Sequence, residues 1–297
     1  MDRDNLKLLV FIPSFNDTFS AYRLAKKFLK NEDIDKVLLV DDSDDDACIS
    51  YANKMRVGAV GRIKVVQRKR SGKWSAWRMA FEEGLAYDGM IEVDADVEID
   101  DIDILISSLE KFDCVTAYQE IKIPEKGLEK IISLIYRDMH EELQDKQKFN
   151  MGGQIIALSN RVLEMFFNKG LFMEPVVADD HVVCLAAYAL GFKCSTIDCG
   201  FQIGLPSNVK DWIRYRSRHR GAINWAESYV AAKTGLKKRT KMVSRYDFSL
   251  TLKSFLKSVF KNTLIFAPLL LVFLAISSRV MVENPVKWTR IDSEKIS

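Results

Sequence analysis

The chain has 297 residues, of which 48% are hydrophobic and 29% are charged, and its formal net charge is +3. This length suffices for one large domain with an appendage or for two small domains. The hydrophobic content excludes an intrinsically disordered chain, and so small a net charge does not by itself indicate a nucleic-acid partner.

The cysteine and histidine pattern argues against a zinc site. Five cysteines and three histidines are present, no two cysteines form a CxxC pair, and the histidines lie far apart. We therefore expect reduced, mostly buried thiols in a cytosolic compartment. The N-terminal segment MDRDNLKLLVFIPSF does not fit a secretory signal peptide, because its apolar run is short and acidic residues replace the basic region.

The first part of the chain alternates between strand-like and helix-like segments. Near-continuous apolar runs such as LKLLVFIPSF are typical of strands that are buried on both faces. Alternation of strands and helices predicts βαβ units and a mainly parallel sheet. Strands are predicted at residues 6–15, 36–42, 62–68, 89–96 and 114–119, and helices at residues 21–30, 47–55, 75–85 and 104–112.

The second part of the chain is less regular. A helix is predicted at 130–147, and the segment FNMGGQIIALS indicates a glycine turn followed by a strand. A second helix at 181–190 ends at Gly191, and another strand is predicted at 193–204. Residues 211–232 form a basic helix or helix pair that carries aromatic residues, and we expect its tryptophans, like Trp77 earlier in the chain, to pack against other side chains.

Polar clusters follow four successive predicted strands. They occupy residues 14–17, 41–46, 68–73 and 94–96. In a parallel sheet, ligands bind beyond the carboxyl ends of the strands. These four clusters therefore predict one composite binding site.

The acidic cluster Asp94-Ala95-Asp96 is the strongest candidate for metal binding. It forms the end of the predicted strand GMIEVDAD, so two carboxylates emerge at the edge of the sheet. Hard cations such as Mg²⁺ or Mn²⁺ typically take one or two carboxylates together with phosphate oxygens, and such a cation would neutralise a departing diphosphate. The alternative is a solvated acidic turn.

A second acidic pair, Asp41 and Asp42, forms the end of the predicted strand KVLLVDD. Carboxylates at this position can accept hydrogen bonds from a nucleobase N–H or from ribose hydroxyls. The alternative is a solvated loop whose aspartates cap the next helix, and this is the reading that we prefer for residues 44–46.

Taken in order, these motifs resemble those of glycosyltransferase family 2. The similar segments are VFIPSFND, VDDSDDD, Gly72-Lys73 with Ala76, DADVE, MGGQIIALSNRVLE and ADDHVVCLAAYALGFK, and together they span roughly residues 7 to 225. The resemblance implies an α/β chain with the GT-A fold, which is a Rossmann-like, mainly parallel sheet flanked by helices.

The resemblance also implies roles for individual residues. Asp96 would be the main ligand of Mn²⁺ or Mg²⁺, Asp180 would be the catalytic base, and Asp94 would face the ribose or support the metal indirectly. The alternative for Asp180 is a helix N-cap, which does not exclude catalysis. The predicted nucleotide and donor site comprises Pro13, Ser14, Phe15, Asp17, Asp42, Lys73, Asp94, Gly152, Gly153, Arg216 and Arg218.

Two departures from the family pattern affect the prediction. The family often has Glu-Asp where this chain has Asp179-Asp180, and processive members carry a Gln-x-x-Arg-Trp motif where this chain reads WIRYRSRHRGAINW. The second departure favours transfer of a single sugar over polymer synthesis. One interpretation is that Arg216 and Arg218 bind the diphosphate or close over the donor. The alternative is a solvated basic helix face near anionic lipid.

The C-terminal region predicts attachment to a membrane. Residues 237–261 form a basic amphipathic segment that leads into the apolar run of residues 264–276. The positive charge before this run predicts a cytoplasmic catalytic part. A buried core helix is the alternative, because the run is shorter than a standard spanning helix. We therefore divide the chain into a catalytic domain (1–235, with a nucleotide-sugar half to about 115 and an acceptor half from 116) and a membrane-associated helical segment (236–297).

The function predicted from these patterns is that of an inverting, metal-dependent glycosyltransferase. It would move one sugar from a UDP- or GDP-sugar to a lipid-linked or glycan acceptor at the cytoplasmic face of the cell membrane, with no nucleic-acid partner. One alternative is a sugar-phosphate nucleotidyltransferase, although the segment PSFND lacks the glycine-rich loop of such enzymes. The other alternative is a catalytically inactive membrane protein that binds nucleotide-sugars.

Overall fold

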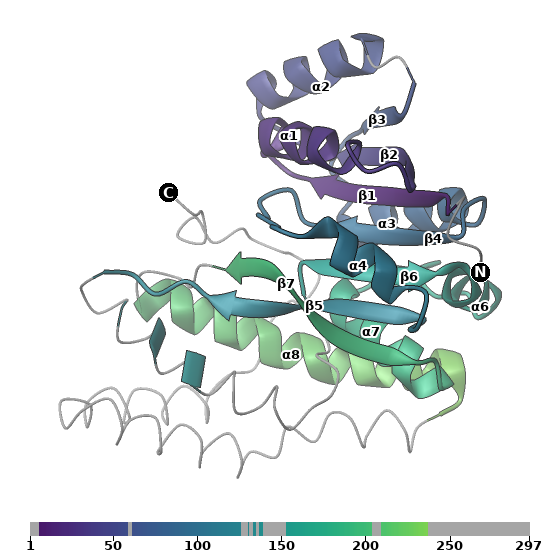
Figure 1. Cartoon of the computed structure of the whole chain (residues 1–297). Helices are drawn as coiled ribbons and strands as arrows, with labels where there is room; N and C mark the ends of the chain where they lie inside the picture. The colour runs from purple at the N-terminus through teal and green to yellow at the C-terminus, as the bar shows by residue number, and fades with distance from the viewer. Residues whose placement is uncertain are drawn as a thin grey trace.

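The computed structural model describes residues 6–58, 61–125, 153–203 and 209–236, together with residues 130, 133, 134, 137 and 138; it leaves out the side chains of 57, 58 and 209–221. The described segments form three layers, with one sheet between two groups of helices (Figure 1).

The sheet has seven strands within the described residues, in the order β3-β2-β1-β4-β6-β5-β7. Strand β6 runs antiparallel to β4 and β5, and the other neighbouring pairs are parallel. The strands are β1 (Leu8–Ser14), β2 (Ile34–Asp41), β3 (Ile63–Gln67), β4 (Gly89–Val93), β5 (Cys114–Ile121), β6 (Ile155–Ser159) and β7 (Cys194–Ile203).

Helices cover both faces of this sheet. One face packs against α1 (Thr18–Phe28), α2 (Asp46–Gly58) and α4 (Ile102–Ser108). The opposite face packs against α3 (Lys73–Gly84), α6 (Asn160–Asn168), α7 (Asp179–Leu190) and α8 (Val209–Thr234).

Side-chain alternation along the strands explains the two cores. In β1, Leu9 and Phe11 point into the core beneath α3 and α7, whereas Leu8, Val10 and Ile12 point into the core beneath α1. All five are fully buried, and each buried side chain of this kind contributes about 1.5–3 kcal/mol. Burial on both faces is the physical reason for the continuous apolar run in this part of the sequence.

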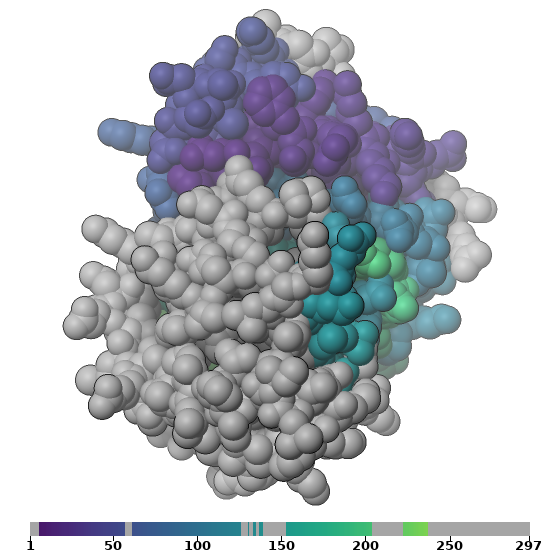
Figure 2. All heavy atoms as spheres, turned by 90° about the vertical axis from the view of Figure 1, so that its left-hand side faces the viewer, coloured from purple at the N-terminus to yellow at the C-terminus, as the bar shows by residue number. Residues whose placement is uncertain are grey.

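The strand order creates a switch point between β1 and β4. From β1 the chain moves outward through β2 to β3, and it then returns to the other side of β1 as β4. Ligand sites in such sheets lie at the carboxyl ends of the strands beside this reversal. The arrows of β5 and β7 point to the left in Figure 1, and Figure 2 shows the molecule from that side.

The predicted strands and helices of the first part are confirmed, with shifts of a few residues at their ends. The predicted helix at 181–190 is also confirmed and ends at Gly191, which has a left-handed conformation. The segment 211–232 lies within one continuous helix, α8, and not in a helix pair. Helix α6 was not predicted, and the predicted helix at 130–147 lies largely outside the described residues.

The predicted burial of most of the cysteines is confirmed, whereas the predicted cytosolic compartment remains a prediction. All five thiols are free, and all except Cys194 are buried. Trp77 is fully buried, as expected for a packing residue. Among the described residues, no helix is long and apolar enough to cross a membrane. The predicted membrane-associated segment lies outside them from residue 237 onward, and the division into catalytic halves remains a prediction.

The contact between β4 and β6 predicts the effect of one substitution. A Cβ added at Gly89 would lie 2.7 Å from the backbone oxygen of Leu158, which cannot move without disturbing β6. We expect Gly89→Ala to destabilise the protein by about 1–3 kcal/mol, measured by urea unfolding. Gly84→Ala is the matched control, because its Cβ would meet the movable end of the Leu163 side chain. An equal effect of both substitutions would contradict this explanation.

Candidate functional site

The polar clusters that follow β1, β2, β3 and β4 meet at one edge of the sheet. The first contact is between the loops after β1 and β2. Asn16 has a φ of 57°, a left-handed conformation that asparagine tolerates better than most residues. Its side chain accepts hydrogen bonds from the backbone N–H groups of Asp44 and Asp45 (3.1 Å each) and donates one to the Asp44 carboxylate (2.7 Å). This one side chain therefore makes three hydrogen bonds between the two loops.

Asp41, at the end of β2, also stabilises the two loops, and its side chain is fully buried. One of its carboxylate oxygens accepts hydrogen bonds from the Thr18 hydroxyl (2.9 Å) and the Ser43 hydroxyl (2.7 Å). Ser43 in turn accepts the backbone N–H of Asn16 at 2.9 Å. Asp41 therefore acts as an internal anchor, and its carboxylate has no exposed surface for a ligand.

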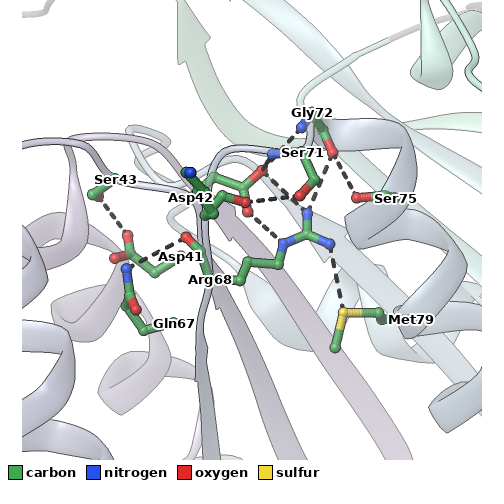
Figure 3. A network of polar contacts seen from close by, with 10 residues as sticks. Asp41, Asp42, Ser43, Gln67, Arg68, Ser71, Gly72, Ser75 and Met79 are labelled. Carbon is green, nitrogen blue, oxygen red and sulfur yellow. Dashed lines mark hydrogen bonds and ion pairs between the residues drawn. The ribbon is translucent and has the colours of Figure 1, made fainter.

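Asp42 holds the loop that follows β3 (Figure 3). Its carboxylate pairs with the Arg68 guanidinium in a bidentate contact, at 2.5 Å from Nε and 3.1 Å from Nη2. The same carboxylate accepts the backbone N–H groups of Ser71 (3.2 Å) and Gly72 (3.1 Å). Gly72 has a φ of 87° and is the N-cap of α3, so Asp42 determines where that helix begins.

Phe15 and Arg70 add an aromatic platform beside this loop. The Arg70 guanidinium lies over the Phe15 ring, 4.2 Å from its centroid, which is a favourable cation–π geometry. Phe15 follows β1 and Arg70 follows β3, so the contact bridges two strand ends. Arg70 belongs to the loop after β3 that Asp42 holds, and Phe15 belongs to the predicted nucleotide and donor site.

Lys73 is the centre of a second network, one residue beyond Gly72. Its ammonium lies 2.7 Å from Asp94 Oδ1, 2.9 Å from Glu92 Oε1 and 3.4 Å from Asp179 Oδ2. Asp179 also accepts a hydrogen bond of 2.5 Å from the Trp77 indole. The start of α3, the end of β4 and the start of α7 are thus joined by one cation.

The pKa values in this network follow from burial and charge. Burial disfavours the charged form of Lys73, but the carboxylates around it outweigh that cost and raise its pKa well above the usual range. Burial raises the pKa of Asp94 to about 6, with the Asp96 carboxylate adding to the effect and Lys73 opposing it. Burial likewise raises the pKa of Glu92 well above its ordinary value. For both carboxyl groups, burial favours the protonated form and the Lys73 ammonium opposes it.

Asp180 lies in the first turn of α7, and its carboxylate is half-buried. One oxygen accepts the backbone N–H of His181 at 2.8 Å, and the other accepts the backbone N–H of Gly153 at 3.3 Å. The N-cap position belongs to Ala178, whose φ of 54° is uncommon for alanine and is often found at functional sites. The carboxylate is therefore oriented by two amides, and each oxygen keeps a lone pair.

Asp96 lies just beyond β4 and is exposed, whereas Asp94 is half-buried. The backbone N–H of Asp94 donates to the carbonyl oxygen of Gln154 at 2.9 Å, so the acidic turn lies beside the start of β6. No group of three or more His, Cys, Asp or Glu residues in the described segments is arranged to hold a metal ion. A cation at Asp96 would take its remaining ligands from phosphate and water.

The structure thus brings together several of the residues predicted from sequence. Lys73, Asp94, Gly153 and Asp180 belong to one connected region, and Asp42 and Phe15 lie in the adjoining loops. Pro13 and Ser14 end β1, and Asp17 is the N-cap of α1. Gly152 and the side chains of Arg216 and Arg218 lie outside the described part of the chain, so their predicted roles remain predictions.

Sequence reasoning missed the polar roles of Glu92, Trp77 and Arg68. The only available signal for Glu92 was a charged residue inside an otherwise apolar strand, because a buried charge is costly unless it is paired. Arg68 was recognised only as part of a polar cluster. Nothing in the sequence pairs Trp77 with Asp179, which lies 102 positions away.

Comparison with solved structures bears on the fold. The mannosyltransferase PcManGT from Pyrobaculum calidifontis, solved in complex with GDP-Man and Mn²⁺, matches with a TM-score of 0.58 and 13% identity, over 93% of this chain and 82% of that chain. The chain has the GT-A glycosyltransferase fold. The fold implied by the resemblance to family 2 is therefore confirmed.

Two further structures are similar at lower TM-scores, which do not by themselves establish a common fold. S. aureus TarS matches with a TM-score of 0.47 and 15% identity, over 71% of this chain and 39% of that chain. Glucosyl-3-phosphoglycerate synthase from Mycobacterium tuberculosis, in complex with Mn²⁺, UDP and glucosyl-3-phosphoglycerate, matches with a TM-score of 0.44 and 15% identity, over 67% and 71% of the two chains. No family model and no curated protein matches the sequence.

The Asp42 contacts predict a loss of stability on removal of its charge. We expect Asp42→Asn to destabilise the protein by roughly 2–3 kcal/mol, because the half-buried Arg68 would lose a charged, bidentate partner. Unfolding in urea measures the change. The control is Glu82→Gln, which breaks the exposed Arg78–Glu82 pair and should cost under about 0.5 kcal/mol. Similar effects of the two substitutions would show that the Asp42 loop contacts do not stabilise the fold.

Proposed function

We propose that this chain is an inverting, metal-dependent glycosyltransferase that transfers a single sugar from a UDP- or GDP-sugar. The observation that carries the proposal is the Lys73 network, which joins the acidic turn after β4 to the turn that bears Asp180. This network lies at the switch point of a GT-A sheet, where ligands of such folds bind. The mannosyltransferase PcManGT was solved in complex with GDP-Man and Mn²⁺, which is consistent with this substrate class.

The donor nucleotide would occupy the edge between the loops after β1, β2 and β3. Phe15 and its partner Arg70 offer an aromatic and cationic surface for a nucleoside. Asp42 is engaged by Arg68 and two backbone amides, so its contribution in this structure is to shape the loop around the donor. Pro13, Ser14 and Asp17 complete this side of the proposed donor site.

The residues beyond β4 fit a hard divalent cation. An exposed carboxylate on Asp96, with Asp94 beside it, is the oxygen donor set that Mn²⁺ and Mg²⁺ prefer. When bound, such a cation supplies charge neutralisation for the leaving diphosphate. Asp96 would hold the cation directly, and Asp94 would support it from the Lys73 network.

Asp180 is the proposed general base. Its carboxylate would take the proton from the acceptor hydroxyl, and the resulting oxygen would attack the anomeric carbon of the donor sugar. The bond between that carbon and the diphosphate oxygen breaks, and the nucleoside diphosphate leaves with the electron pair. Attack opposite the leaving group inverts the anomeric centre. The backbone amides of Gly153 and His181 would hold the base in position throughout.

We also propose a lipid-linked or glycan acceptor at the cytoplasmic face of the cell membrane. Support comes from the basic amphipathic segment 237–261 and the apolar run 264–276 in the sequence. Transfer of one sugar, and not polymer synthesis, is supported by the departure of the segment 212–225 from the processive motif.

A donor screen tests the proposed function. The purified chain is incubated with UDP- and GDP-sugars, membrane extract as acceptor, and Mn²⁺ or Mg²⁺, and transfer is followed with labelled sugar. We expect cation-dependent transfer from one donor class. Release of pyrophosphate from a nucleoside triphosphate without transfer would instead indicate a nucleotidyltransferase. Donor binding without transfer to any acceptor would indicate an inactive binding protein.

The base assignment predicts the behaviour of Asp180→Asn. We expect this variant to keep donor binding and to lose transfer by roughly 10²–10⁴-fold, because the amide cannot accept the proton. Calorimetric donor titration and initial rates measure the two properties. Asp35→Asn is the control, since Asp35 is exposed near the amino end of β2, away from the site. Unchanged turnover of the Asp180 variant would rule out this residue as the base.

The metal assignment predicts the behaviour of Asp96→Ala. Loss of this carboxylate should weaken Mn²⁺-dependent nucleotide binding by roughly tenfold or more, while binding without a cation stays the same. Titration of UDP and GDP with and without Mn²⁺ measures the difference, with Asp35→Ala as control. A Mn²⁺ titration identical to that of the unmodified protein would contradict a metal role for Asp96.

A further inference from the structure

We propose that Glu92 and Lys73 are positioning residues, which hold the carboxylates of Asp94 and Asp179 in one fixed arrangement for sugar transfer. The inference rests on the proposed function and extends it to a residue beneath the site. Glu92 lies within β4 and has no exposed surface, so it cannot contact the donor, the acceptor or a cation directly.

The place of Glu92 in the sheet is unusual for an acid. Successive residues of a strand point to opposite faces, so Glu92 points to the same face as Met90, which belongs to the core beneath α3 and α7. The polar contact of the Glu92 carboxyl group within the described residues is with the Lys73 ammonium, whose Nζ lies 2.9 Å from Oε1. An apolar residue would fill this position at lower cost, so the carboxyl group points to a role through Lys73.

Besides Glu92, the Lys73 ammonium contacts the carboxyl groups of Asp94 and Asp179. An ammonium group has three N–H donors, and three carboxyl groups surround this one. Glu92 belongs to β4, Asp94 is the first residue of the acidic turn after it, and Asp179 lies at the start of α7. A Lys73 hydrogen that turned towards a bound diphosphate would have to leave one of these partners.

The network reaches the proposed base and metal ligand through adjacent residues. Asp179 is held between Lys73 and the Trp77 indole, and it directly precedes Asp180. Asp94 is held by Lys73 two positions before Asp96. A shift of the ammonium would therefore move both the base and the acidic turn, and misplacement of reacting groups by about 1 Å can cost roughly 10²-fold in rate.

Kinetics of Glu92 variants test the inference. Glu92→Met removes the oxygens that face Lys73 and suits the apolar core. We expect its kcat to fall roughly tenfold or more, with the donor KM and the nucleotide Kd changed less than about twofold. Glu92→Gln keeps an oxygen for the ammonium and should retain most of the kcat. Glu82→Met, on the exposed side of α3, is the matched control and should behave like the unmodified protein.

Lys73→Met separates positioning from diphosphate binding. Positioning predicts a lower kcat with an unchanged nucleotide Kd, whereas a diphosphate contact predicts a weaker Kd and would overturn the inference for this residue. Lys64→Met removes an ammonium that pairs with Glu83 at the surface and serves as control. An unchanged kcat for Glu92→Met, or equal losses for Glu92→Met and Glu92→Gln, would overturn the role of Glu92.

An unfolding cycle keeps the inference testable without activity. The single variants Lys73→Met and Glu92→Met and the double variant are unfolded in urea. We expect the unfolding equilibrium constant of the double variant to differ by roughly fivefold or more from the product of the two single effects. The reason is that each group loses its charged partner in the single variants. If the unmodified chain transfers no sugar, the proposed function fails. The unfolding cycle then tests by itself whether Lys73 and Glu92 are energetically coupled. Additive effects would then show that the two residues are not coupled.

Discussion

One ammonium group, that of Lys73, joins three elements that are far apart in the sequence. It pairs with Glu92 and Asp94 of the β4 region and with Asp179 of α7, and the Trp77 indole donates a hydrogen bond to Asp179. In a buried setting, removal of one partner leaves the other charges uncompensated, so such a cluster is stable only as a whole. The position of each carboxylate at the site therefore depends on a single cation and on the start of α3 that carries it.

The start of α3 is in turn determined by the loops before it. Asp42 accepts the backbone N–H of Gly72, and Gly72 adopts a positive φ that allows the chain to enter the helix directly. The loop after β2 that carries Asp42 is itself clamped by Asn16. Hydrogen bonds between the loops after β1, β2 and β3 therefore fix the start of α3, and with it the position of Lys73. This gives the proposed donor side and the proposed base a common structural support.

Much of the fold was predictable because its physical cause is local. Strands buried on both faces need continuous apolar runs, and β1 and β2 show them, so their existence and parallel packing followed from the sequence. Helix α6 was missed, although Val162, Leu163 and Phe166 have helical spacing, because its nine residues give a short pattern. The antiparallel direction of β6 was not predicted either, since strand direction depends on pairing with β4 and β5 and not on the composition of the strand itself.

The sequence by itself determined the fold class, the order of the strand ends and the types of side chain that gather there. Those properties follow from hydrophobic periodicity and from turns between neighbouring elements. Both depend on residues that are close together in the sequence. Only the tertiary structure decided which groups pair: that Asp42 is satisfied by Arg68, that Asp41 is enclosed, and that Glu92 lies beneath Lys73. These pairings join residues up to 106 positions apart, as between Lys73 and Asp179. They depend on which faces of the strands and helices pack against each other, and a local sequence pattern does not predict that packing.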